Sequence, residues 1–439
     1  MNHSRENGLA VFLARIMRQP NMRPFLILNR LAFRLAQTLA VLPLIMLVAV
    51  GQAQTYDLLL KGGHLIDPKN EIDAPRDVAI TGGRIAAVAQ EIPVGRAKSV
   101  IDVTGLCVAP GFIDIHVHVF ENDRGGDLWA DIGLRAGVTT AVDAGSAGWR
   151  TFPAARREVI ERARTRVLAF LNIAAGGIGR SENKLDDLDP AAAVKFIEQH
   201  RDAIVGIKTA HWASATWDSV ERALEAGRLA NLPIMVDFGH FLPQRPFEEL
   251  VGKRLRPGDI YTHLYISAVP MLDHQGRLRP YLLEAQRRGV IFDAGHGQGS
   301  FSYRQAVPAT RDGFWPNTIS TDIHKGNINR GMKDMANVMS KFLNLGLSLP
   351  EVIARSTWAP ARAIRRPEYG HLTVGAGADI AVFKVLKGDF GFYDVLGGKV
   401  EGSQKIECEL TLRDGEVVWD LNARSMSRWQ DLPPNAPTK

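Results

Sequence analysis

Five side chains that can bind or bridge metal ions each follow a short apolar run of the chain. They are His116 and His118 in GFIDIHVHVF, Lys208 in VGIKTAHW, His263 in IYTHLY and Asp322 in TISTDIH. Alternate residues of a strand share one face, so the first two imidazoles can reach the same cation. Each motif alone is weak evidence, because an isolated histidine is often satisfied near a core and an aspartate after a strand often caps a helix. Their ordered recurrence predicts a single metal site.

Strand and helix patterns alternate through the middle of the chain. The apolar runs predict eight strands, near residues 109–116, 138–143, 166–173, 204–209, 232–238, 259–264, 289–294 and 318–322. Amphipathic stretches such as AARREVIERARTR and SVERALEAGRLA lie between them. This alternation predicts an α/β fold, a parallel (β/α)8 TIM barrel over residues 110–370. Chemistry in such a barrel takes place at the carboxyl ends of the strands, where all five side chains fall.

The segments on both sides of the barrel predict a second, smaller domain. Residues 54–109 and 371–425 contain runs such as YDLLLKGGHLID and CELTLRDGEVVWD, whose Gly and Asp-Gly turns are typical of hairpins. We expect the two segments to pair in space as one small β-sandwich. Residues 426–439, which end in PPNAPTK, are predicted to form a flexible tail.

The two cysteines, Cys107 and Cys408, both fall in the predicted small domain. Oxidising surroundings would permit a disulfide between them, but two buried thiols are the favoured interpretation. The chain contains no Cys-x-x-Cys motif, so a metal ion must be held by nitrogen and oxygen ligands.

Residues 1–53 have the pattern of an export signal. Arg30 and Arg34 precede the apolar run LAVLPLIMLVAV, and GQAQ then supplies the small residues that a signal peptidase needs before Gln54. An uncleaved membrane anchor is the competing interpretation, but the apolar run is shorter than the roughly 20 residues of a spanning helix. We therefore expect a periplasmic or secreted protein with no stable membrane insertion after cleavage.

The charge and composition exclude some classes of partner. The chain is 46% hydrophobic and 23% charged, which is ordinary for a globular protein. It has 53 Lys and Arg against 47 Asp and Glu, and six Arg and one Glu of these lie in residues 1–53. The remainder is therefore close to neutral, and nothing in it calls for a nucleic acid or an anionic membrane.

Taken together, these motifs resemble the amidohydrolase superfamily of metal-dependent hydrolases, and within it the dihydroorotase-like and N-acyl amide deacetylase branch. The resemblance also rests on VAPGFIDIHVH, GVTTAVDAGSAG, FDAGHGQGSF, ADIAVF and LRDGEVV, and it covers nearly the whole chain after residue 54. It implies a site with two divalent metal ions. Imidazole and carboxylate ligands suit Zn²⁺ best.

The resemblance also implies a role for each ligand. His116 and His118 would hold one ion together with Asp322, and His263 would hold the other. Lys208 as an ammonium would repel metal, but a neutral amine can take up carbon dioxide and become an anionic carbamate. The resemblance gives a carbamylated Lys208 the task of bridging the two ions, whereas an isolated lysine at a strand end would simply reach solvent.

The implied reaction is hydrolysis of a carbon–nitrogen bond other than a peptide bond, with a small N-acyl or cyclic amide as substrate. A hydroxide bridging the two ions would attack the carbonyl carbon, and a cation would stabilise the resulting oxyanion. Asp322 would take up a proton and pass it to the departing amine. A dihydroorotase of pyrimidine synthesis is disfavoured, because that synthesis is cytosolic and this chain carries an export signal.

The predicted fifth strand departs from the pattern of related enzymes, which usually offer a histidine at its end. Here the run LPIMVDFGH places Asp237 at the matching point and His240 three residues later. Asp237 as an oxygen ligand is the favoured alternative, because its distance from the strand start matches; a turn that brings His240 inward is the other. A carboxylate at this point would also suit a harder ion such as Mn²⁺.

Further polar residues follow the predicted strands and are candidates for the pocket. Ser146 in DAGSAG, Arg180 in GGIGR and His296 in FDAGHGQGSF are candidate substrate-binding residues. His211 and His324 each follow a ligand closely and are candidates for holding that ligand in place. The competing interpretation is that these residues form turns, cap helices or meet solvent in glycine-rich loops.

Two other functions fit the same residues. An ester or lactone hydrolase needs the same activated hydroxide and less protonation of the leaving group. A non-catalytic barrel that only binds a ligand is favoured by the substitution at Asp237 and opposed by the other retained ligands, since fold alone never secures function. Assembly as a homo-oligomer is left open.

Overall fold

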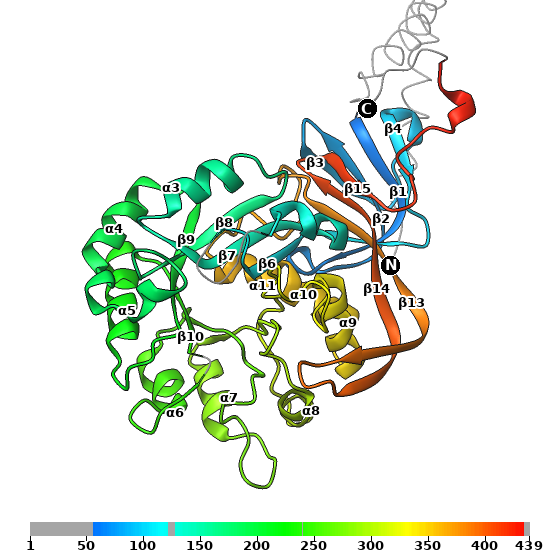
Figure 1. Cartoon of the computed structure of the whole chain (residues 1–439). Helices are drawn as coiled ribbons and strands as arrows, with labels where there is room; N and C mark the ends of the chain where they lie inside the picture. Colours follow the sequence, from blue (N-terminus) through cyan, green and yellow to red (C-terminus); the bar gives the residue numbers. More distant parts are fainter. Residues whose placement is uncertain (1–55, 122–127, 239, 434–439) are drawn as a thin grey trace, which may run out of the picture. The chain divides into compact units, whose positions relative to one another are not determined.

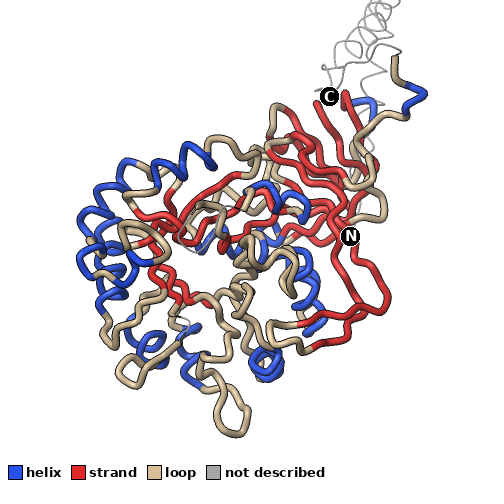
Figure 2. The backbone as a smooth tube through the Cα atoms, in the orientation of Figure 1, coloured by secondary structure: helices blue, strands red, loops and turns tan. Residues whose placement is uncertain are grey.

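The computed structural model describes residues 56–121, 128–238 and 240–433 of the chain. Two sheets organise these residues, with helices around one of them (Figures 1 and 2). Both sheets belong to one compact unit that begins at Tyr56. The predicted signal peptide and the end of the predicted tail lie outside the described residues, so both stay predictions.

Among the described residues, no helix combines the length and the apolar character needed to cross a membrane.

The middle of the chain forms a seven-stranded parallel sheet, ordered β12-β11-β10-β9-β8-β7-β6. Its strands are β6 (Phe112–Val117), β7 (Val138–Gly148), β8 (Arg166–Asn172), β9 (Ile204–Ala210), β10 (Ile234–Asp237), β11 (Ile260–Tyr261) and β12 (Ile291–Phe292). These strands are buried almost throughout, as expected of parallel strands covered on both faces. The prediction of an α/β fold with parallel strands is confirmed.

The predicted eighth strand, near residues 318–322, is an irregular segment that joins the two edges of this sheet. Thr318 pairs in parallel with Asp293 beside β12, and Ile323 pairs in parallel with Val117 of β6. Asp322 between them has a φ of 52°, in the left-handed region, which interrupts regular pairing. The segment therefore closes the curl of the sheet without forming a continuous strand.

The predicted first strand of the barrel, near residues 109–116, is divided in the structure. Pro110 ends β5 (Cys107–Pro110), which belongs to the other sheet, and Phe112 begins β6. Gly111 separates the two strands, and a Cβ at this position would lie 2.1 Å from Thr139 Oγ1. The chain can pass from one sheet to the other here because glycine has no side chain.

Helices cover the outside of the parallel sheet, and α3 to α7 lie outside β7 to β10 in Figure 1. The helices are α3 (Phe152–Ala155), α4 (Pro190–Gln199), α5 (Asp218–Ala230), α6 (Phe247–Glu249), α7 (Pro280–Arg287), α8 (Tyr303–Arg311), α9 (Met335–Leu345), α10 (Leu349–Ser356) and α11 (Trp358–Ala363). Local sequence sets their ends. For example, α4 begins with Pro190 after the N-cap Asp189, whose carboxylate accepts hydrogen bonds from two backbone N–H groups.

The flanking segments form a second sheet of mixed direction, ordered β15-β14-β13-β5-β1-β2-β3, with β4 paired to β1. Besides β5, its strands are β1 (Tyr56–Asp67), β2 (Ile72–Thr81), β3 (Arg84–Ala89), β4 (Ala97–Asp102), β13 (Ile380–Tyr393), β14 (Lys399–Arg413) and β15 (Glu416–Asp420). The contact between β5 and β13 joins the segment before the barrel to the segment after it. Packing of this sheet as a β-sandwich stays a prediction.

The register of this sheet explains why the two cysteines are not bonded. Cys107 on β5 and Cys408 on β14 both lie opposite Phe383 on β13, from its two sides. Two strand spacings place their Cα atoms about 10 Å apart, beyond the reach of a disulfide. Both thiols are free, Cys408 buried and Cys107 half-buried, and burial raises the pKa of Cys408 to about 12.

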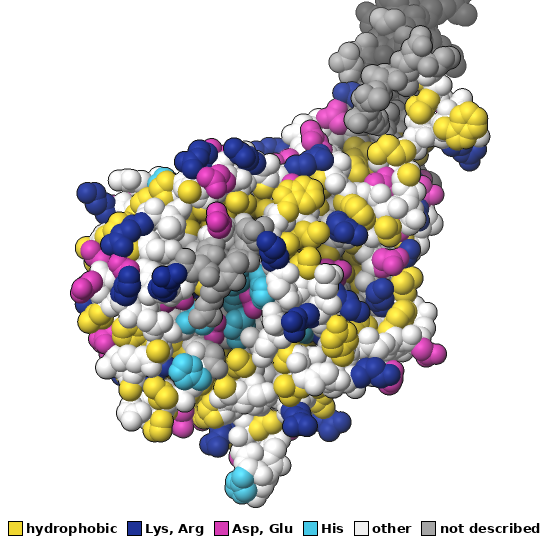
Figure 3. Space-filling view, viewed as in Figure 1, with side chains coloured by type: hydrophobic (Ala, Val, Ile, Leu, Met, Phe, Trp, Pro, Cys, Tyr) yellow, Lys and Arg dark blue, Asp and Glu magenta, His cyan; other side chains and the backbone are white. Residues whose placement is uncertain are grey.

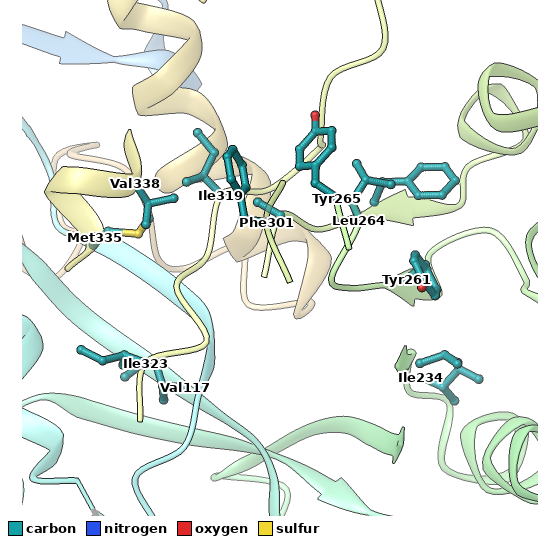
Figure 4. Packing of buried hydrophobic residues seen from close by; sticks show 14 of the residues in the cluster. Val117, Ile234, Tyr261, Leu264, Tyr265, Phe301, Ile319, Ile323, Met335 and Val338 are labelled. Carbon is teal, nitrogen blue, oxygen red and sulfur yellow. The ribbon is translucent and has the colours of Figure 1, made fainter. Parts of the chain in front are cut away.

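A large apolar core fills the space between the parallel strands and their helices. Figure 4 shows part of it, including Val117 of β6, Ile234 of β10, Tyr261 of β11 and Val338 of α9. Each fully buried side chain of this size contributes roughly 1.5–3 kcal/mol relative to an exposed one. This packing fixes the ends of the strands that carry the polar residues described next.

Candidate metal centre

All six residues predicted to bind metal lie at the carboxyl ends of the parallel strands or just beyond them. They are His116 and His118 at the end of β6, Lys208 in β9, Asp237 at the end of β10, His263 after β11 and Asp322 in the closing segment. Five of the six are buried, and the side chain of His118 is 13% exposed. Figure 3 shows histidine side chains gathered near the centre of this face of the molecule.

The carboxylate of Asp322 lies at the centre of the group. Its Oδ1 is 3.1 Å from His118 Nε2 and 3.6 Å from His116 Nε2, and its Oδ2 is 3.8 Å from His263 Nε2. Ligand atoms of His116, His263 and Asp322 all lie within 4.8 Å of one another. Asp237 Oδ2 adds a second carboxylate 3.1 Å from His263 Nε2. The ligand atoms of His116, His263 and Asp322 thus form a group that fits a divalent cation. His118 extends it on the side of Asp322, and Asp237 extends it on the side of His263.

Each imidazole uses its other nitrogen to contact the protein. His263 Nδ1 lies 2.6 Å from the carbonyl oxygen of Gly295, to which it can only donate a hydrogen bond. His118 Nδ1 lies 2.9 Å from Ser146 Oγ. Because Nδ1 is committed in each ring, Nε2 is the atom left for a cation.

His116 makes the corresponding contact with a group of buried hydroxyls. Its Nδ1 lies 2.8 Å from Thr262 Oγ1, which donates to Asp293 Oδ2 at 2.7 Å. The Asp293 carboxylate also accepts hydrogen bonds from Ser320 Oγ and Thr318 Oγ1, both at 2.6 Å. All five side chains are fully buried.

Lys208 is buried beside these ligands with few hydrogen-bond acceptors. Its Nζ lies 3.4 Å from His116 Nε2 and 3.8 Å from Met235 Sδ, and it forms no ion pair with any described residue. An ammonium has three N–H donors and is costly to bury without acceptors for them. Few such acceptors surround the amine.

The charges of the site are strongly coupled. Burial alone would raise the pKa of Asp237, but the neighbouring His263 and Lys208 hold it well below its usual range. Burial alone would lower the pKa of His263, but Asp237 and Asp322 raise it to about 9. The carboxylates thus attract positive charge to this point, as a proton or as a metal ion.

Three residues of the site adopt a backbone conformation that is uncommon outside glycine. His211, His263 and Asp322 have φ values of 50°, 60° and 52°. Such conformations cost on the order of 1–3 kcal/mol each and concentrate at functional sites.

The three predicted substrate-binding residues are placed differently from one another. Ser146 is buried and contacts His118, as described above. His296 is fully buried, and its Nε2 accepts a hydrogen bond of 2.6 Å from Lys341 Nζ. Arg180 is exposed at the start of a short 3-10 helix, Arg180–Asn183. The buried positions favour a supporting role for Ser146 and His296, and all three substrate contacts stay predictions.

The remaining candidate histidines lie around the candidate metal ligands or beyond them. His211 Nδ1 is 3.0 Å from the buried Glu182 Oε2, and its backbone N–H bonds to the carbonyl oxygen of Asp237. The ring of His324 lies 6.5 Å from that of His118. His240 is exposed, so the geometry supports Asp237 rather than His240 as the ligand after β10.

Several residues that hold the site together were not predicted from the sequence. Each is buried and contacts a candidate metal ligand, a candidate substrate-binding residue or another histidine of the site, or is hydrogen-bonded to a residue that does. They are Thr262, Asp293, Glu182 and Lys341. Asp293 follows a parallel strand just as the ligands do, so the same rule could have identified it. Nothing in the local sequence marks Glu182 or Lys341.

No protein-family model matches the chain. The chain is similar to a deacetylase of Enterococcus faecalis, with 32% identity over 378 residues that cover 82% of this chain and 99% of that protein. It is also similar to a deacetylase of Agrobacterium fabrum, with 31% identity over 344 residues that cover 75% of this chain and 83% of that protein.

Solved structures of two other enzymes are also similar to this chain. The fold matches the crystal structure of an adenine deaminase with a TM-score of 0.76 and 29% identity, over 83% of this chain and 100% of that one. It matches the crystal structure of a dihydroorotase with a TM-score of 0.74 and 28% identity, over 83% and 97% of the two chains. The protein therefore belongs to the amidohydrolase superfamily and is a hydrolase of carbon–nitrogen bonds other than peptide bonds.

Proposed function

We propose that the protein is an exported, binuclear metal-dependent amidohydrolase that cleaves the amide bond of an N-acyl or cyclic amide. One observation carries the proposal: three imidazole Nε2 atoms and the carboxylates of Asp237 and Asp322 converge at the carboxyl ends of the parallel strands. The similarity to two deacetylases over most of their length supports an acylated amine as the substrate.

The converging residues fit two divalent ions, which we take to be zinc. His116, His118 and Asp322 would hold one ion, and His263 and Asp237 would hold the other. Ions bound there would polarise the substrate carbonyl and lower the pKa of water. Asp237 in place of a histidine gives the second position an additional negative charge.

Lys208 fits the role of the bridging ligand after reaction with carbon dioxide. The neutral amine forms a nitrogen–carbon bond with carbon dioxide and releases one proton, which leaves an anionic carbamate. The burial of Lys208, the scarcity of acceptors around its amine and its 3.4 Å distance to His116 Nε2 all support this modification.

Asp322 fits the role of the group that carries the proton. Burial alone would raise the pKa of its carboxyl, but the hydrogen bond from His118 and the charge of His263 lower it, so the group is an available base. Gly297 leaves space beside it, because a Cβ there would lie 2.3 Å from Asp322 Oδ2. The carboxylate would take the proton of the attacking water and deliver it to the departing amine.

Replacement of Asp322 by asparagine tests this role. Asp322→Asn keeps the shape of the side chain and removes the base, so we expect bound zinc to be retained and turnover to fall by about 10²- to 10⁴-fold. Metal analysis of the purified variant and steady-state assays measure the two effects. A variant with full zinc and wild-type turnover would contradict the proposed role.

A panel of substrates tests the bond that is cleaved. N-acetyl amino acids, hydantoin-like rings and lactones should be assayed in parallel with the zinc-loaded protein. We expect turnover of at least one amide class. Activity on lactones alone would favour an ester or lactone hydrolase instead.

Export is proposed from the sequence of residues 1–53. The expected mature protein begins at Gln54, which N-terminal sequencing of protein recovered from outside the cytoplasm can check. A full-length chain recovered only from the cytoplasm would contradict export and leave the proposed chemistry untouched.

A further inference from the structure

A buried carboxylate behind the metal centre has no part in the proposed reaction. Asp293 is fully buried and accepts hydrogen bonds from the hydroxyls of Thr262, Thr318 and Ser320. It forms no ion pair with a lysine or arginine in the described part of the chain. Its Oδ2 lies 3.9 Å from His116 Nδ1, too far for a hydrogen bond. Asp293 can therefore act on His116 only through the hydroxyl of Thr262.

The hydroxyl of Thr262 has one proton, and its position decides the state of His116. Thr262 Oγ1 donates that proton to Asp293, so toward His116 Nδ1, at 2.8 Å, it can only accept. The imidazole must then carry its proton on Nδ1. A neutral ring with this proton presents a free electron pair at Nε2, the atom that faces Lys208 and Asp322.

The neighbouring imidazole has a contact of the same kind. His118 Nδ1 lies 2.9 Å from Ser146 Oγ, and the backbone N–H of Ser146 donates to the buried carboxylate of Asp143 at 2.7 Å. Each histidine of the His-x-His pair thus contacts the hydroxyl of a residue that is itself hydrogen-bonded to a buried aspartate, and for His116 the hydroxyl itself donates to that carboxylate. The two arrangements come from different segments of the sheet, so local sequence does not impose the repetition.

We propose that Thr262 and Asp293 are positioning residues that fix His116 in the Nδ1–H tautomer and aim its Nε2 at the cation. This inference rests on the proposed metal site. A ring in the other tautomer would place a proton where the cation must bind, and loss of such a supporting contact weakens metal binding by about 10- to 100-fold.

The test compares zinc affinities of the full-length protein, measured by competition with a chelator of known affinity. Thr262→Val keeps the size of the side chain and removes the hydroxyl, and we expect it to bind zinc about 10- to 100-fold more weakly. Thr262→Ser keeps the hydroxyl and should restore affinity to near the wild-type value. Thr411→Val is the matched control, because Thr411 is equally buried and donates its hydroxyl proton to a backbone carbonyl, that of Leu134.

A second measurement reads the tautomer directly and needs no turnover. Long-range proton–nitrogen spectra of the metal-free protein should show the His116 proton on Nδ1 in the wild type and in Thr262→Ser. In Thr262→Val we expect the Nε2–H form to appear. Circular dichroism and thermal unfolding establish that each variant is folded.

The outcomes separate this inference from the proposed function. Wild-type protein that binds no zinc would overturn the proposed function. Wild-type protein that binds zinc, with a folded Thr262→Val variant of equal affinity and unchanged tautomer, would overturn the inference alone. Equal losses in Thr262→Val and Thr411→Val would also overturn it, since the effect would then come from general destabilisation.

Discussion

Asp237 places a negative charge in the candidate metal centre. A histidine ligand at this point would be neutral, whereas the Asp237 carboxylate lies with its Oδ2 3.1 Å from His263 Nε2. In the metal-free protein a proton on His263, whose pKa is raised to about 9, balances that charge. A divalent ion must displace this proton, so binding at the second position is expected to strengthen as pH rises toward 9.

Replacement of Asp237 should affect the two metal positions unequally. We expect Asp237→Ala to retain about one equivalent of zinc and to lose most of the other, because the remaining ligand set of the first ion is unchanged. Elemental analysis after zinc-replete expression measures the stoichiometry. His240→Ala is the control, since His240 is exposed three residues later and its loss should leave both equivalents in place. Equal metal content in the two variants would contradict the assignment of Asp237 as a ligand of the second ion.

At the scale of elements, the hairpin formed by β13 and β14 packs against α9, which contacts the loop that carries His296. Lys341 Nζ on α9 lies 2.7 Å from the carbonyl oxygen of Tyr393, at the hairpin tip, 2.8 Å from that of Gly331 and 2.6 Å from His296 Nε2. His296 precedes Gly297, which lies against Asp322. One buried amine therefore links the tip of the small sheet to the loop beside the proposed base.

The protonation of Lys341 gives a stability prediction. Burial lowers the pKa of Lys341 from 10.5 to about 7, so between these values the unfolded chain binds the proton and the folded protein releases it. Stability rises with pH wherever the unfolded state binds more protons. The unfolding free energy of the wild type, relative to Lys341→Met, should therefore increase from pH 7 to pH 10.

Urea unfolding of the two proteins at pH 7, 8, 9 and 10 measures this difference. Lys384→Met is a suitable control, because Lys384 lies on the same hairpin and its neighbour Glu407 raises its pKa. The difference in unfolding free energy between the wild type and Lys384→Met should stay nearly constant over this pH range. A flat difference for Lys341→Met as well would show that the buried amine keeps its proton.

The elements that could be predicted from sequence are those with regular periodicity. Buried runs ending in a polar residue predicted β6 to β10 and placed the candidate ligands in or near the carboxyl ends of these strands. The eighth segment could not be predicted in detail, because Thr318, Ser320 and Thr321 use their side chains to bond Asp293 and Asp114 in place of regular strand pairing. The contacts of Lys341 could not be predicted either, because its three acceptors come from segments far apart in the sequence.

At the scale of the whole molecule, a charged cluster joins the two sheets at the end opposite to the metal centre. Arg166, the first residue of β8, donates to Asp379 at 2.5 Å, and Arg413 of the mixed sheet contacts the same carboxylate at 3.1 Å. The side chains of all three are mostly buried. Asp379 thus neutralises two arginines from two different sheets.

Loss of Asp379 should destabilise the protein and leave its chemistry unchanged. Asp379→Ala removes the buried carboxylate that Arg166 and Arg413 share and leaves them only the exposed Asp414, so we expect the unfolding free energy to fall by about 1–3 kcal/mol. Residues at the amino ends of barrel strands serve stability, so zinc affinity should not change. Denaturant unfolding and zinc titration measure the two quantities.

Lys98→Ala removes the exposed ion pair with Asp57 and is the control for a surface charge. Its unfolding curve should match that of the wild type, because exposed ion pairs contribute little. A loss of zinc affinity in Asp379→Ala at temperatures where the variant is folded would contradict the conclusion that this end of the strands serves stability and not metal binding.

The pairing of β5 with β13 has a consequence for how the chain is made. Ala109 lies opposite Ala381, so the ribosome must synthesise the entire barrel before β5 can pair with β13 on the side away from β1. At about 5–20 residues per second this delay lasts on the order of tens of seconds. Throughout it, the backbone groups of β5 on that side are an open template for other nascent chains. Truncated chains that stop before residue 380 are therefore expected to aggregate through β5.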